Sequence, residues 1–177
     1  MEYDDIGRGP EVAEAVREFV EETVLPVERE WLGRGPLPPA EIEALRDAAR
    51  DEGIYAPQVD EEYGGLGLGF REMLPVFEEA GRSLLGPTAL RCAAPDEGNM
   101  HTLEIAATEE QKERWLRPLA AGEIDSGFAM TEPMGGGGSD PKMLGTTAEK
   151  DGDEWVIDGH KWWTTGGLDA DVFLTFA

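Results

Sequence analysis

The hydrophobic pattern of this chain changes its period once, near Gly122, and this change limits the folds that the chain can adopt. Before it, apolar residues recur at roughly every 3.6 positions, as they do along one face of a helix. After it, short segments rich in Val, Thr, Phe and Trp alternate with turn signals such as "KDGDE" and "DGHK". The pattern predicts an α+β protein, in which an N-terminal all-α domain (1–123) precedes an incomplete antiparallel β-barrel or sandwich domain (124–177).

Individual elements follow from the same pattern. The predicted helices span 11–31, with a kink at Pro26, then 40–52, 71–84, and 109 to about 119, the last opened by a capping box of Thr108 and Gln111. The predicted strands lie in "SGFAMTE", "LGTTAEK", "EWVID", "KWWTT" and "DVFLTFA". The partners of the last strand are expected beyond Ala177 or in another polypeptide, and such an apolar edge invites association.

Composition excludes several classes of protein. The single cysteine, Cys92, cannot form an internal disulfide and is expected to be a buried small hydrophobe. His101 and His160 lie too far apart in the sequence for a metal-ligand motif, so we expect no metal site. No apolar run is long enough for a membrane span, and the acidic start "MEYDDIGRGPE" does not look like a signal peptide. These features predict a cytoplasmic protein.

The charge of the chain is strongly negative. Thirty-eight acidic and 15 basic residues give a formal net charge of −23, which repels nucleic acid and anionic membranes. One interpretation is an ordinary, well-solvated acidic surface. The other, which we favour because the acid is spread along the whole chain, is halophilic adaptation to high salt, where screening removes the repulsion.

A glycine tetrad interrupts the first predicted strand region. In "GFAMTEPMGGGGSDP" (127–141), an apolar run breaks into Thr-Glu-Pro and then Gly135 to Gly138, which pack nothing and lose the most backbone entropy on folding. A loop that costs this much backbone entropy needs a reason, which the hydrophobic pattern does not supply. The other glycine-rich stretch, "EEYGGLGLGF", has the wrong spacing and context for a dinucleotide-binding fingerprint.

These motifs together resemble a known family. "FAMTEP", the glycine loop ending in "SD", and "VIDGHKWWTTGG" are similar to the flavin-binding portion of acyl-CoA dehydrogenases. "APQVDEEYGGLGLGFREMLPVFEEAGRS" and "EEQKERWLRPLAAGEI" resemble the family's helical N-terminal domain, so the resemblance runs essentially end to end. "CAAPDEGNM" and "HKWW" resemble most closely the long-chain-type subgroup that is sometimes fused to an aminoglycoside-phosphotransferase-like kinase domain.

The resemblance implies that the β domain binds FAD. Phe128, Met130 and Thr131 would lie along the flavin ring, Trp163 would lie against it, and the Thr165 hydroxyl would bond flavin N5, the atom that receives hydride. A hydrogen bond to a charged group contributes roughly 1.5–3 kcal/mol, so a hydroxyl at that place favours the reduced ring.

The resemblance also assigns the neighbouring residues. Ser139 would contact the CoA part of the substrate, and Gly166 stands where many relatives have Asn. For Glu132 we expect a structural or N-cap role rather than that of a base, and for His160 a solvated place in a hairpin. Neither histidine is assigned a catalytic role.

The implied reaction is α,β-dehydrogenation of an acyl-CoA thioester. The family's catalytic Glu belongs to a C-terminal helical domain, so we expect no catalytic residue within 1–177 and no turnover by this chain alone. A general base is worth roughly 10²–10⁴-fold in rate. The expected partners are acyl-CoA, a C-terminal half or an oligomer partner, and an electron-transfer flavoprotein.

Two other hypotheses stay open beside a truncated or split dehydrogenase. The chain could serve as a non-catalytic assembly or regulatory subunit that pairs with a full-length dehydrogenase, or as a stand-alone module that binds flavin or CoA. Copurification with an intact paralogue would favour the first, and a yellow isolated chain would favour the second.

Overall fold

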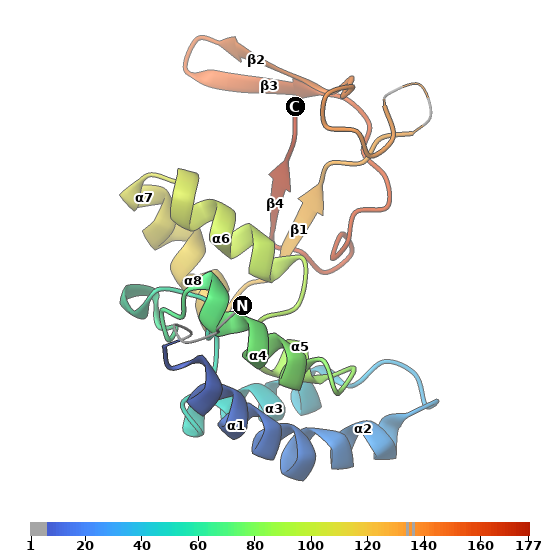
Figure 1. The fold of residues 1–177 in the computed structure, drawn as a ribbon. Helices are drawn as coiled ribbons and strands as arrows, with labels where there is room; N and C mark the ends of the chain where they lie inside the picture. Colours follow the sequence, from blue (N-terminus) through green and yellow to red (C-terminus); the bar gives the residue numbers. More distant parts are fainter. Residues whose placement is uncertain (1–6, 134, 136) are drawn as a thin grey trace, which may run out of the picture.

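The helices lie at one end of the molecule and the strands at the other (Figure 1). The computed structural model describes residues 7–133, 135 and 137–177, and within them every helix precedes every strand. The helical elements are α1 (Gly9–Phe19), the π-helix η1 (Val20–Val24), α2 (Leu25–Trp31), α3 (Pro39–Asp51), the 3-10 turn η2 (Glu61–Tyr63), α4 (Phe70–Ala80), α5 (Gly86–Ala89), α6 (Asp96–Ala106), α7 (Glu109–Gln111), the π-helix η3 (Lys112–Leu116) and α8 (Arg117–Ala121). The strands are β1 (Ser126–Ala129), β2 (Thr147–Asp151), β3 (Glu154–Asp158) and β4 (Val172–Thr175).

The hydrophobic core belongs mainly to the helical part. Helices α1 and α4 lie side by side, and the face that each buries follows the helical period predicted from the sequence (Figure 1). On α1 the buried face includes Val16 and Phe19, and on α4 it includes Met73 and Val76. Cys92 is also buried in this core, as predicted, and burial, followed by the nearby Glu97 carboxylate, raises the pKa of its thiol to about 12.

The four predicted helical segments are confirmed, except that the third ends at Ala80 instead of Leu84. Segment 11–31 is helical but changes type, because η1 separates α1 from α2, and segment 109–119 is divided in the same way by η3. The capping box is present: the Thr108 hydroxyl accepts from the Gln111 N–H (3.3 Å), and the Gln111 side chain accepts from the Thr108 N–H (2.9 Å).

Helix α6 was missing from the prediction. Its apolar residues do not recur at the helical period, and only Asn99 and Met100 are fully buried along its eleven residues. Nothing in its hydrophobic pattern therefore distinguishes it from a loop.

The sheets correct two predictions. Strands β1 and β4 pair in parallel, with Ser126 opposite Val172 and Ala129 opposite Thr175, whereas β2 and β3 form an antiparallel hairpin. The "DVFLTFA" strand thus has a partner within this chain, and only one of the two pairs is antiparallel. Within the described residues, the strands form no closed barrel.

The predicted strand "KWWTT" is also wrong. Residues 161–165 form a loop, because Trp163 has a φ of 51°, which an extended strand cannot contain. Among the described residues, this loop pairs with β1 in the manner of a strand at one place, the antiparallel bridge between Phe128 and Thr165.

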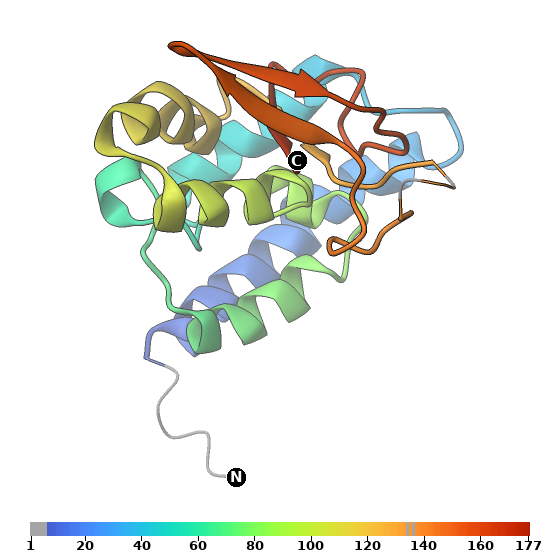
Figure 2. The ribbon, with the colours of Figure 1, turned by 90° about the horizontal axis from the view of Figure 1, so that it is seen from above.

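The hairpin β2–β3 stands clear of the helices in Figure 1, and it is the part nearest the viewer when the molecule is seen from above (Figure 2). Every residue of both strands is exposed, including Trp155, Val156 and Ile157. In the part of the chain that the structure describes, no helix combines the length and apolar character needed to cross a membrane.

Candidate functional site

Two distant segments meet at the end of β1. Phe128 forms an antiparallel bridge with Thr165, and the Trp162 N–H donates to the Thr131 carbonyl (3.0 Å). The two motifs that the sequence singled out, about 30 residues apart, are therefore adjacent in space. The segment 128–131 and the loop 161–165 together form one continuous surface.

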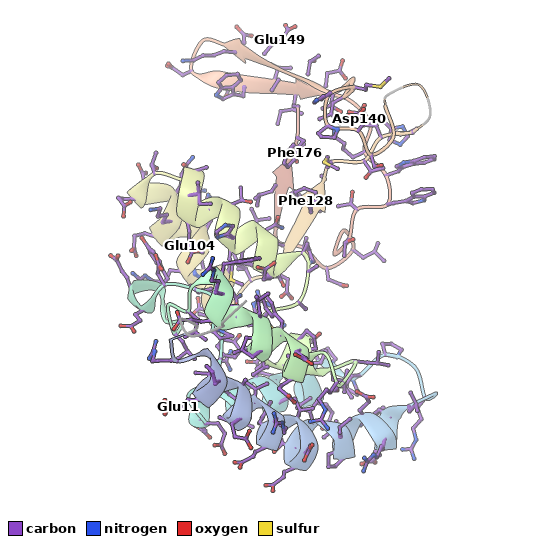
Figure 3. The ribbon with its side chains drawn as sticks, in the orientation of Figure 1. Glu11, Glu104, Phe128, Asp140, Glu149 and Phe176 are labelled. Carbon is purple, nitrogen blue, oxygen red and sulfur yellow. The ribbon has the colours of Figure 1, made fainter. Side chains whose placement is uncertain are left out.

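The residues predicted to contact flavin differ in their exposure. Phe128, Met130 and Thr131 are half-buried along the end of β1, and Thr165 is exposed. Phe128 packs edge-on against Phe176, with ring centroids 5.1 Å apart and planes at 67°. Figure 3 shows these two phenylalanines next to each other, Phe128 on β1 and Phe176 directly after the end of β4.

Trp163 projects from the loop 161–165 into the solvent. Its side chain is 82% exposed, and its ring stacks on Trp162 with centroids 4.6 Å apart and planes at 7°. The turn that follows is packed tightly, because Gly166 has a φ of 77° and a Cβ there would lie 2.6 Å from the Ser126 carbonyl oxygen. Gly166 thus lets the loop approach the start of β1.

A cleft of about 270 Å³ lies beside this surface. Phe128 and Thr165 form one wall. The other wall is the start of α6 with the residues before it, and comprises Ala94, Pro95, Glu97, Gly98 and Asn99. This second wall was not predicted to belong to the site, although its residues lie in "CAAPDEGNM" (92–100), a segment that carries the family resemblance.

Hydrogen bonds fix β1 to α6. The Asp96 carboxylate accepts from both the Ser126 N–H (2.9 Å) and the Ser126 hydroxyl (2.5 Å). The buried Asn99 side chain in turn donates to the Ser126 hydroxyl (2.8 Å). The two walls of the cleft are therefore held at a fixed spacing by polar contacts between Asp96, Asn99 and Ser126.

Arg91 reinforces the same junction. Its side chain is 1% exposed and forms ion pairs with Asp125 (2.7 Å) and Asp96 (3.2 Å). It also donates to the carbonyls of Leu119 (3.0 Å) and Ile124 (2.6 Å). A guanidinium buried this deeply requires such a full set of acceptors, and the set joins α8, the start of α6 and the entry to β1.

The Glu132 carboxylate is occupied by donors on all sides. It accepts from the N–H groups of Gly145 (2.6 Å) and Thr146 (2.9 Å), from the Thr146 hydroxyl (2.5 Å) and from Lys161 Nζ (2.8 Å). The Lys161 ammonium first, then the Thr146 hydroxyl and the Gly145 N–H, lowers the pKa of Glu132 to about 2. Such a carboxylate is a poor proton acceptor, which agrees with the structural role predicted for it.

The glycine loop uses its glycines for backbone geometry. Gly135, Gly137 and Gly138 have φ values of 109°, 86° and 62°, a region that other residues rarely adopt, and Gly136 lies outside the described residues. Ser139 is exposed in the same turn and does not line the cleft. The structure thus brings the segments that carry the predicted flavin-contacting residues together, and the Glu132 N–H bond to the Gly138 carbonyl (2.9 Å) brings the turn that carries Ser139 close to the end of the same segment.

The surface suits a flat ring with polar edges. The aromatic rings of Phe128, Trp162 and Trp163 offer apolar area, while the hydrogen bonds described for this region use neither the Thr131 nor the Thr165 hydroxyl. Within the described residues, no group of three or more His, Cys, Asp or Glu side chains is placed to hold a metal ion.

Comparisons of sequence agree with this geometry. Residues 10–123 match the model of the acyl-CoA dehydrogenase N-terminal domain, and residues 127–177 match that of the acyl-CoA dehydrogenase middle domain. A probable acyl-CoA dehydrogenase, FadE2 of Mycobacterium tuberculosis, is 44% identical over 132 residues, covering 74% of this chain and 31% of the relative. Acyl-CoA dehydrogenase family member 11 of Gallus gallus is 36% identical over 172 residues, covering 90% of this chain and 21% of the relative.

Solved structures show the same likeness. A putative acyl-CoA dehydrogenase from Mycobacterium abscessus is 41% identical with a TM-score of 0.84, covering 96% of this chain and 45% of that one. A glutaryl-CoA dehydrogenase from Mycobacterium smegmatis, solved in complex with FADH2, is 29% identical with a TM-score of 0.74, covering 96% and 42%. The chain thus spans less than half the length of these relatives. It belongs to the acyl-CoA dehydrogenase family, of which it contains the N-terminal domain and residues that match the middle domain.

Proposed function

We propose that this chain forms the flavin-facing wall of an FAD-dependent acyl-CoA dehydrogenase, an enzyme that removes the α- and β-hydrogens of an acyl-CoA thioester. The observation that carries the proposal is the bridge between Phe128 and Thr165, which joins the two flavin-site motifs beside a cleft. The division into a helical domain (1–123) and a flavin-binding β domain (124–177) is part of the proposal.

The proposal gives each residue of the wall a task. Phe128, Met130 and Thr131 would border the ring along the end of β1, Trp163 would cover it with an apolar face, and Thr165 would donate its hydroxyl to the ring's polar edge. Bound FAD would supply the oxidising ring that accepts hydride from the β-carbon of the substrate. Ser139 would contact the CoA part of the substrate, outside the cleft.

Within this proposal, Glu132 does not act as the base. Its carboxylate already accepts from four donors within the protein, and its low pKa makes it a weak proton acceptor. The role of this chain is to bind and orient. We also predict that an electron-transfer flavoprotein accepts the electrons, a prediction that only the family supports. The cytoplasmic location stays a prediction as well.

The test replaces the matching segment of the Mycobacterium abscessus protein by this chain, because the two share 41% identity and a TM-score of 0.84. We expect the chimera to purify with bound FAD and its visible absorbance to bleach with an acyl-CoA. Thr165→Val should keep FAD bound but slow bleaching about ten- to a hundredfold, because one hydrogen bond to the reduced ring is lost. Trp163→Ala should instead lower FAD retention.

The exposed Trp155 of the hairpin provides the matched control, since Trp155→Ala also removes an exposed indole. We expect this variant to retain FAD. A chimera that folds with the parent's thermal stability but contains no flavin would refute the proposal, and so would equal FAD loss in Trp163→Ala and Trp155→Ala.

A further inference from the structure

The loop that carries Trp163 and Thr165 is fixed to the rest of the protein at few points. Trp163 is largely exposed and has a positive φ, so burial does not determine where its ring lies. The described anchors of the loop are the Trp162 N–H bond to Thr131, the bridge from Thr165 to Phe128, and the side chain of Lys161. Whatever holds Lys161 therefore also holds the loop.

Lys161 is held at two places on one segment. Its ammonium donates to the Met130 carbonyl (2.9 Å) and to the Glu132 carboxylate (2.8 Å), and the side chain is only 11% exposed. A lysine this deeply buried needs a negative partner, because desolvation otherwise disfavours its charge. Glu132, 2% exposed, is that partner.

Glu132 also holds the chain that leaves the glycine loop. Through its bonds to the N–H groups of Gly145 and Thr146 and to the Thr146 hydroxyl, it fixes the entry to β2. One carboxylate therefore joins three segments: the end of β1, the entry to β2 and the start of the loop 161–165. A capping residue needs only local bonds, whereas the Lys161 ammonium donates to Glu132, 29 residues away, and to the Met130 carbonyl, 31 residues away.

We propose that the buried ion pair of Glu132 and Lys161 is a positioning device, which holds the loop 161–165 against the end of β1 and so aims Trp163 and Thr165 at the flavin. The aim toward flavin rests on the proposed function, whereas the anchoring of the loop does not. Neither residue of the pair lines the cleft, so each acts through the residues that it holds.

The first experiment measures the anchoring without flavin. The 177-residue chain is labelled with fluorotryptophan, and the ¹⁹F resonances of Trp162 and Trp163 are assigned with Trp→Phe variants. In Lys161→Met we expect these two resonances to shift and broaden, while those of Trp31 and Trp115 in the helical part stay in place and report that the chain is folded. Lys161→Arg, which keeps the charge, should restore the original resonances.

Glu132→Gln provides the second variant and Glu149→Gln its matched control. Glu132→Gln removes the charge but keeps an acceptor for Gly145 and Thr146, and it should displace the same two resonances. Glu149 lies on the exposed strand β2, far along the hairpin from the loop, so Glu149→Gln should leave them unchanged (Figure 3). Resonances of Trp162 and Trp163 that stay in place in folded Lys161→Met would overturn the proposal.

The second experiment measures FAD affinity in the chimera, and it separates this inference from the proposed function. We expect Lys161→Met to weaken FAD binding about tenfold, because Trp163 and Thr165 are then no longer held at the end of β1, and Lys161→Arg to recover most of the affinity. An unsubstituted chimera without FAD would count against the proposed function alone. A chimera that binds FAD with the same affinity before and after the Lys161→Met substitution would count against the positioning role.

Discussion

At the scale of single residues, Glu132 and Asp96 show what sequence can and cannot reveal. The resemblance located Phe128, Thr131, Trp163 and Thr165, because each belongs to a short motif that can be recognised alone. The roles of Asp96 and Asn99 depend instead on Ser126, 30 and 27 residues away, and no local pattern connects them. A structural role for Glu132 could be predicted, but its partner Lys161 could not, because the pairing exists only once both loops have folded.

Glu132 should contribute to stability in a pH-dependent manner. Because its pKa falls from 4.5 to about 2 in the folded protein, its contribution is fully present above about pH 4.5 and is lost as the pH falls through about 2. We therefore expect the difference in melting temperature between wild type and Glu132→Gln to be largest at neutral pH and to shrink steadily between pH 4.5 and 2.

Melting curves at intervals of about half a pH unit would check this. Glu149→Gln again serves as the control, since Glu149 is exposed on β2 and should show no such trend. A difference for Glu132→Gln that stays constant down to about pH 2 would mean that the carboxylate is not held by these donors in solution.

At the scale of elements, the helices were predictable where an amphipathic stripe marks them, as in α1, α3 and α4. The strands were less so. The parallel pairing of β1 with β4 joins residues 46 positions apart, and hydrophobic alternation says nothing of the direction in which two strands run. The loop 161–165 was mistaken for a strand because its Trp and Thr residues favour strands, whereas the tertiary structure imposes a positive φ at Trp163.

The glycine loop allows a comparison between two neighbouring positions. Gly137 and Gly138 both have positive φ, but a Cβ on Gly137 would lie 2.3 Å from the Met143 carbonyl oxygen, whereas one on Gly138 would meet nothing within 4 Å. We expect Gly138→Ala to cost about 1–2 kcal/mol of unfolding free energy, for the backbone strain alone. Gly137→Ala should cost about 1–3 kcal/mol more, because Met143 must move.

Urea unfolding of the two variants would measure both values. Equal losses would show that the close contact between Gly137 and Met143 is relieved without cost, and that only the backbone conformation requires glycine in this loop.

At the scale of the whole molecule, the charge of −23 opposes folding at low salt. Most described arginines have acidic partners nearby, as Arg17 has in Glu14 and Glu79, and Arg82 in Glu21 and Glu79. The pairs with both side chains exposed, Arg17 with Glu14 and Arg82 with Glu21, contribute little, and the larger number of acidic residues leaves carboxylates that repel one another. Composition alone was enough to predict this imbalance, because it does not depend on how the chain folds.

We therefore expect the melting temperature to rise substantially between dilute buffer and molar KCl. The Debye length falls from about 30 Å at 0.01 M to about 3 Å at 1 M, so the repulsion between all like charges is screened at once. Sucrose of equal osmolality controls for exclusion of the cosolute from the surface, and it should raise the melting temperature less. A melting temperature that stays flat or falls as KCl is added would contradict adaptation to high salt and would favour an ordinary acidic surface.

The two π-helices have a consequence for how related chains are aligned. Each ends two residues before a proline, η1 before Pro26 and η3 before Pro118, and the residue just before each proline bonds the carbonyl five positions back, Leu25 to Val20 and Arg117 to Lys112. A π turn holds one residue more than the α turn that it replaces, and it accommodates a proline that cannot donate. The proline and the extra residue of the π turn should therefore be gained or lost together. A relative that lacks Pro26 or Pro118 should also show a one-residue gap in the turn before that position when the two sequences are aligned.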